Sequence, residues 1–186
     1  YQVVEAATEE GLGFDPAAGS RGGNVACPFC GTVADTSYIR LEAQAGHVDL
    51  QPMVVVCTRK SEQGKVYVPA NEIRTAIWAN ATTIPGRIAA LEVDAHGDGL
   101  HTLTRPTEAI EANPRSMDAQ HYGFKEWVDL FTPRQLLSLL TFVKHVCAAH
   151  YEMGQQQYGN LQSKAIATYL GILVNRLADY NSSLCS

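Results

Sequence analysis

Charged residues and long apolar runs are both scarce in this sequence, and each shortage excludes a class of protein. No apolar stretch approaches the ~20 residues that a membrane-spanning helix needs, so we expect no membrane partner. Only 18% of the residues are charged, and the formal net charge is −5. Because proteins that bind nucleic acid on their own are usually basic, any DNA contact should be confined to a local patch or shared with other parts of a longer protein.

The common short motifs of catalysis and phosphate binding are also missing. The sequence contains neither a GxGxxG pattern nor a P-loop, and no histidine neighbours a serine or cysteine in a nucleophile motif. There are five cysteines, an odd number of which only two are closely spaced, and this argues against a disulfide scaffold. We therefore expect a cytoplasmic protein in a reducing environment.

The closely spaced pair forms the most informative motif, Cys27-Pro-Phe-Cys30-Gly. Two thiolates around a tight Pro/Gly turn form a zinc knuckle, so Cys27 and Cys30 are predicted to bind zinc. A redox role would require the motif to begin a helix after a buried strand, whereas here a glycine-rich stretch precedes it. A third reading is two ordinary turn cysteines. Cys57 and His47 are the nearest candidates to complete the metal site, and neither is assigned.

Structural zinc requires four ligands, usually from two knuckles, and only one knuckle is present. This half-site, together with the residues at the two ends of the chain, leads us to expect a piece of a longer protein. The remaining zinc ligands would then lie outside this chain.

The pattern of apolar residues predicts an α+β fold: a small zinc-ribbon-like β-hairpin unit followed by a helical part with two long antiparallel helices. The expected organisation is a flexible lead-in (1–23), a zinc-knuckle and β-hairpin unit (24–69), a helix and long loop (70–131) and a helical hairpin (132–186). The expected elements are strands over 1–5, 53–58 and 65–69 and helices over 37–45, from 71 to about 82–86, 133–154 and 161–180.

Two surface regions are weaker candidates for binding. Arg59, Lys60 and Lys65 surround the predicted hairpin tip and could contact DNA phosphates, although a solvated hairpin tip has the same composition. Arg134 follows the helix start Thr132-Pro133, where the first turn is electropositive, although a plain capped helix start has the same pattern. Asp179 and Asn181 are candidates, with Arg134, for a helical face that meets a cofactor or substrate.

Several segments together resemble one family. They are Cys-Pro-Phe-Cys-Gly (27–31), Tyr-Ile-Arg (38–40), Gly-Lys-Val-Tyr (64–67), Tyr-Gly (122–123), Trp-Val-Asp-Leu-Phe-Thr-Pro-Arg-Gln-Leu (127–136) and Arg-Leu-Ala-Asp-Tyr-Asn-Ser-Ser (176–183). In this order they resemble the zinc-ribbon-containing adenine-specific DNA methylases associated with anti-phage defence. The resemblance implies S-adenosylmethionine as the cofactor of the parent enzyme, DNA as its substrate, and an earlier CxxC that completes the zinc site.

The family also has a glycine-rich cofactor motif upstream and an Asp-Pro-Pro-Tyr catalytic motif downstream, and the latter is absent from this sequence. We therefore predict no catalytic residue in this chain and no methyl transfer by it alone. The expected role is positioning of DNA, in contact with the remaining parts of the same polypeptide. The alternative is a structural or protein-interaction module that does not contact DNA.

Overall fold

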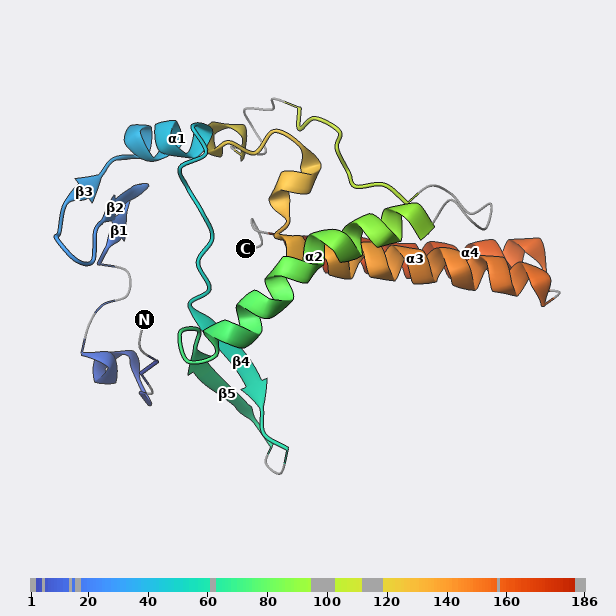
Figure 1. Ribbon diagram of the computed structural model, residues 1–186, viewed down its shortest axis with the longest axis horizontal. Helices are drawn as coiled ribbons and strands as arrows, with labels where there is room; N and C mark the ends of the chain where they lie inside the picture. Colours follow the sequence, from blue (N-terminus) through green and yellow to red (C-terminus); the bar gives the residue numbers. More distant parts are fainter. Residues whose placement is uncertain are drawn as a thin grey trace. The chain divides into compact units, whose positions relative to one another are not determined.

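The computed structural model describes residues 3–4, 6–13, 15, 18–60, 63–94, 103–111, 119–156 and 158–182. The chain divides into two compact units. Unit 1 comprises residues 1–78 and 112–124, and unit 2 comprises residues 79–111 and 125–186. The predicted α+β class is confirmed, because the described elements are two small antiparallel sheets and four α-helices (Figure 1).

Unit 1 contains a three-stranded antiparallel sheet built around the knuckle. Strand β1 (Ser20–Arg21) pairs with β2 (Asn24–Ala26), and β2 pairs with β3 (Val33–Ala34). Gly22 and Gly23 form the two-residue turn between β1 and β2, with φ of 60° and 84°. Hairpins of this kind need positive φ at both turn positions, which glycine adopts without strain. The predicted lead-in thus contains strand β1, as well as the short 3-10 helix η1 (Glu9–Leu12).

Helix α1 (Thr36–Gln44) follows the knuckle sheet within one residue of its predicted limits. The Asp35 side chain caps its first turn by accepting a hydrogen bond from the Tyr38 amide. Gly46, with φ of 76°, lies just beyond its last turn, where a left-handed residue commonly ends a helix. The 3-10 helix η2 (Ala119–Tyr122) packs against α1.

The second sheet is the predicted hairpin. Strands β4 (Val54–Thr58) and β5 (Lys65–Pro69) pair in antiparallel register, with Cys57 opposite Val66 and Thr58 opposite Lys65. Residues alternate between half-buried and exposed along β4, as expected when only one face of a sheet is covered.

Helix α2 (Arg74–Asp94) differs from its prediction. The sequence signals placed its start near Asn71 and its weakening at 82–86, but the helix starts at Arg74 and continues through Pro85 to Asp94. Proline cannot donate a backbone hydrogen bond, which normally disfavours a helix interior. Ile84 and Ile88 on either side of Pro85 are buried in the core of unit 2, and this packing stabilises the helix across the proline. The boundary between the two units falls inside α2, after Trp78.

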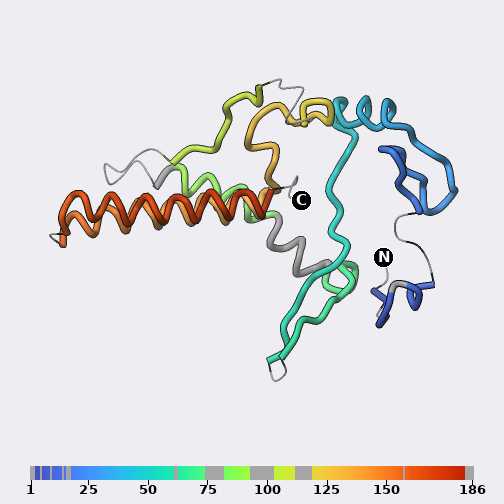
Figure 2. Tube along the Cα trace, turned by 180° about the vertical axis from the view of Figure 1, so that it is seen from behind, coloured from blue at the N-terminus to red at the C-terminus, as the bar shows by residue number. Residues whose placement is uncertain are grey.

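The largest part of unit 2 is a pair of long helices, α3 (Pro133–Gln155) and α4 (Asn160–Tyr180), preceded by the 3-10 helix η3 (Trp127–Leu130). The two helices lie side by side and are antiparallel, as predicted, and Figure 2 shows the same pairing from behind. Thr132 and Gln135 form a reciprocal capping box at the start of α3. The predicted end of α3 at Gly154 is within one residue of the observed end at Gln155.

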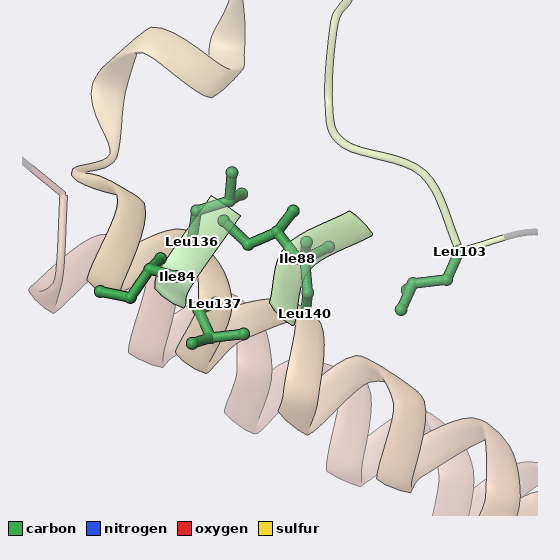
Figure 3. Close-up of a cluster of buried hydrophobic side chains, with 6 residues drawn as sticks. All are labelled: Ile84, Ile88, Leu103, Leu136, Leu137 and Leu140. Atoms are coloured by element: carbon green, nitrogen blue, oxygen red, sulfur yellow. The ribbon is translucent and has the colours of Figure 1, made fainter. Parts of the chain in front are cut away.

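The hydrophobic core of unit 2 is a cluster of aliphatic side chains from α2, α3 and the segment near Leu103 (Figure 3). Its buried members are Ile84, Ile88, Leu103, Leu136, Leu137 and Leu140. Two backbone hydrogen bonds tie the segment around 106–110 to η3: Val128 N–H to Pro106 O (2.8 Å) and Trp127 N–H to Glu108 O (3.1 Å).

Val3 and Val4 are not in a strand, and residues 1, 2 and 5 of the predicted first strand lie outside the described residues. None of the described helices has a stretch that is both long enough and apolar enough to cross a bilayer.

Candidate metal centre and surface sites

The knuckle is a tight turn between β2 and β3. The Cys27 amide donates to the Thr32 carbonyl (2.8 Å), and the Gly31 amide donates to the Cys27 carbonyl (2.9 Å). Gly31 has φ of 72°, which permits the chain to turn back after Cys30. Cys27 is half-buried, Cys30 is exposed, and Phe29 between them is 97% exposed. Both cysteines are free thiols on a turn that the flanking strands hold in place.

Hydrogen bonding around Cys30 favours its thiolate form. Its sulfur lies 3.3 Å from the Thr32 hydroxyl oxygen. Hydrogen bonds from the Thr32 side chain and backbone, and then from Cys27, lower the pKa of Cys30. Because the thiolate is the form that binds metal, this shift suits a ligand position.

The two thiols fit one half of a tetrahedral thiolate site for zinc. Within the described part of the chain, no group of three or more cysteine, histidine, aspartate or glutamate side chains could hold a metal ion. His47 instead has its Nδ1 atom 2.7 Å from Glu42 Oε2, and Cys57 is a half-buried residue of β4 paired with Val66. The described residues thus supply two donors, Cys27 and Cys30.

The candidate phosphate contacts lie at the open end of the β4–β5 hairpin. Arg59 and Lys60 follow β4 directly and Lys65 begins β5, opposite Thr58. All three are exposed. The hairpin therefore brings three cationic residues to one end of a two-stranded sheet.

The candidate residues for a surface that meets a cofactor or substrate lie at one end of the α3–α4 hairpin. Arg134 is in the first turn of α3, and Asp179 and Asn181 are at the end of α4, so the antiparallel pairing places all three at the same end. Asp179 Oδ2 lies 3.1 Å from Arg176 Nη1, and Asn181 donates its side-chain amide to the Leu177 carbonyl (2.8 Å). Asp179 and Asn181 therefore already stabilise the last turn of α4.

Two residue pairs were not singled out by the sequence reasoning. In unit 1, the Arg40 guanidinium lies over the Tyr122 ring, 5.3 Å from its centroid. In unit 2, the Arg176 guanidinium lies 4.5 Å from the Tyr180 ring centroid and donates to the Tyr180 hydroxyl (2.6 Å). The spacing of four residues on a helix signals the second pair, whereas no local pattern signals the first.

Comparison of the chain with known protein families, with curated proteins and with solved structures finds no match in any of the three.

Proposed function

We propose that this chain is the zinc-ribbon and helical segment of an S-adenosylmethionine-dependent, adenine-specific DNA methyltransferase of the cytoplasm. Its role is to position DNA rather than to transfer the methyl group. The observation that carries the proposal is the ordered series of sequence segments, from the knuckle at 27–31 to the run at 176–183, that resembles this family.

A contact between two resembling segments that are far apart in the sequence supports the proposal. Arg40, from the Tyr-Ile-Arg segment, packs over Tyr122, from the Tyr-Gly segment. Gln44 in the same helix donates its side-chain amide to the His121 carbonyl (3.1 Å). Segments about 80 residues apart that resemble the family thus contact one another, as expected if they share one structural role.

The division of roles follows from the residues present. Cys27 and Cys30 would supply two of the four ligands of a structural zinc ion. The bound ion would rigidify the small knuckle sheet. Arg59, Lys60 and Lys65 would neutralise DNA phosphates, a contact that gives affinity without sequence preference. Methyl transfer would need the Asp-Pro-Pro-Tyr motif from another part of the parent enzyme.

A direct experiment separates positioning from chemistry. The chain, incubated with labelled S-adenosylmethionine and duplex DNA, should transfer no label, whereas the parent enzyme should do so. Transfer by the chain alone would refute the proposed division of roles.

The DNA contact has its own test in the parent enzyme. Reversing the charge of Arg59, Lys60 and Lys65 together should weaken DNA binding and reduce the slope of log K against log salt by up to about 3, since each phosphate contact contributes about 0.9. Reversal at Lys164, an exposed residue of α4, is the matched control. An unchanged slope in the triple variant would remove the hairpin from the DNA-binding surface.

A second candidate function, a protein-interaction module without DNA contact, is favoured by one observation. Large apolar side chains on α4 are exposed, among them Leu161 (86%), Tyr169 (73%) and Leu173 (60%). Exposed apolar groups of this size are common at protein interfaces. If this function holds, Tyr169→Ala and Leu173→Ala in the separate chain should abolish its association with the other parts of the parent enzyme. The same substitutions in the intact parent enzyme should leave the salt dependence of DNA binding unchanged.

A further inference from the structure

The α3–α4 hairpin contains an open cavity near the end where its two helices are joined, and six of the ten described residues that line it are exposed. Its volume is about 560 Å³, within the ~300–1,000 Å³ typical of small-molecule sites. Residues from the last turns of α3, the connection and the first turns of α4 line it. Two small residues, Gly154 and Ala167, are among them, and a Cβ atom added to Gly154 would meet no described heavy atom within 4 Å.

The cavity combines aromatic rings with neutral hydrogen-bonding groups. Tyr151, Tyr158 and His150 contribute rings, and Gln155 and Asn160 contribute side-chain amides. None of the described residues that line it carries a carboxylate, an ammonium or a guanidinium group. Aromatic rings stack on planar heterocycles, and amide side chains pair with their polar edges.

Other ligand classes fit this lining less well. A metal ion would have Cys147 and His150 as donors, and the described residues contain no group of three suitable side chains. An anion would find no lysine or arginine among the described lining residues. The buried Ser163 hydroxyl already donates to the Asn160 carbonyl (3.1 Å).

We propose that this cavity binds a purine base, with adenine preferred. A purine matches the aromatic lining because its large π face stacks well, and the side-chain amides of asparagine and glutamine pair well with the N6 and N7 atoms of adenine. The neutral lining recognises the base and makes no contact with a phosphate. This inference rests on the cavity alone and is independent of the proposed methyltransferase role.

The test is a titration of the whole chain with adenosine, followed by NMR of the tyrosine rings and the side-chain amides. We expect a Kd on the order of 1 mM, typical of a weak small-ligand site. The largest changes in chemical shift should be those of the side chains of Tyr151, Tyr158, Gln155 and Asn160. Uridine, whose stacking face is smaller, should bind at least threefold more weakly, and adenosine monophosphate should bind with the same Kd as adenosine.

Gly154→Leu should weaken adenosine binding at least tenfold, because the new side chain extends from a wall of the cavity while favouring the helix. Gly171→Leu is the matched control in α4: a Cβ there also meets no described atom within 4 Å, but Gly171 does not line the cavity. Gln155→Ala, at an exposed position, tests the cavity a second time, and it should weaken adenosine binding at least threefold.

The purine site is overturned if adenosine shifts none of these signals at millimolar concentration. It is also overturned if both Gly154→Leu and Gln155→Ala bind adenosine as the unaltered chain does. Tenfold tighter binding of the monophosphate would equally refute it, since the phosphate would then be recognised.

Discussion

Gly123 lies directly against the backbone of helix α1: a Cβ atom at this position would be only 2.6 Å from the carbonyl oxygen of Ala43. Its φ of 86° is also in the left-handed region, which side chains other than glycine rarely adopt. Two independent constraints thus require glycine where the segment after η2 meets α1. The Tyr-Gly pair at 122–123 therefore has a structural role in unit 1, through the Arg40–Tyr122 contact and this close approach.

Replacement of Gly123 by alanine should destabilise unit 1. The left-handed conformation costs about 1–2 kcal/mol for a residue with a Cβ, and the contact with the Ala43 carbonyl forces a further backbone shift. We expect a total loss of about 2–4 kcal/mol, measured by hydrogen exchange of the α1 amides. Gly46→Ala is the matched control, because Gly46 also has positive φ but an open surrounding, and it should cost about 1–2 kcal/mol. Equal losses in the two variants would show that the close approach is unimportant.

Truncation of Leu140 should destabilise unit 2. Leu140 is one of the six buried residues of the core cluster, so Leu140→Ala removes apolar contacts and leaves a cavity. The expected loss is about 2–5 kcal/mol in the free energy of unfolding, measured by urea denaturation. Leu161→Ala provides the control, since Leu161 is 86% exposed and its truncation should change stability by less than about 0.5 kcal/mol. A small effect at Leu140 would contradict the assignment of the core.

Loss of the capping box of α3 should lower the stability of unit 2 by less than truncation of Leu140 does, because it affects only the start of the helix. Thr132 accepts a hydrogen bond from the Gln135 amide, and the Gln135 side chain accepts one from the Thr132 amide (2.7 Å). Thr132→Ala removes the first of these bonds and should cost about 1 kcal/mol, measured by thermal unfolding. Ser138→Ala, an exposed position one turn later in α3, should be neutral within about 0.5 kcal/mol. If both variants behave alike, the cap makes no net contribution.

The start of α1 should be sensitive to acid. The Asp35 carboxylate accepts hydrogen bonds from the Ser37 hydroxyl (2.6 Å) and the Tyr38 amide (2.8 Å), and these bonds lower its pKa. A carboxyl whose pKa is lower in the folded state contributes stability at pH above its unfolded value of about 3.9, and this contribution is lost as the pH falls through the folded value.

NMR of the α1 amides should therefore report fraying of the first turn below about pH 4. Asp35→Asn retains a capping side chain but has no titrating group, so α1 in this variant should be independent of pH over the same range. Identical pH profiles for the two proteins would show that another group is responsible.

Zinc content tests the half-site. The chain alone should bind well under one zinc ion per molecule, because its described residues offer two donors, while the parent enzyme should bind one, measured by metal analysis after dialysis. Cys27→Ser in the parent should release the ion, and Cys147→Ser, on α3, should not. Stoichiometric zinc in the isolated chain would instead mean that residues of this chain or a second copy complete the site.

The predictions from sequence succeeded where the signals are local. Alternation of β-branched residues around a glycine-containing connection predicted β4 and β5 to within one residue. The Thr132-Pro133 start and the helical spacing of leucines likewise predicted α3 and α4. The knuckle is also a local feature, since its turn depends on Pro28, on the positive φ of Gly31 and on the pairing of the adjacent strands β2 and β3. The zinc, the cofactor and the DNA contact remain predictions.

The sequence by itself determined the turns, the caps and the apolar faces of the long helices, because these depend on residues a few positions apart. Only the tertiary structure decided that α2 continues through Pro85, since burial of Ile84 and Ile88 outweighs the missing backbone bond. It also decided the contact of Arg40 with Tyr122 and the close approach of Gly123 to Ala43, which join residues about 80 positions apart. The cavity between α3 and α4 was likewise decided only by the tertiary structure, because the space left by small residues depends on what packs around them.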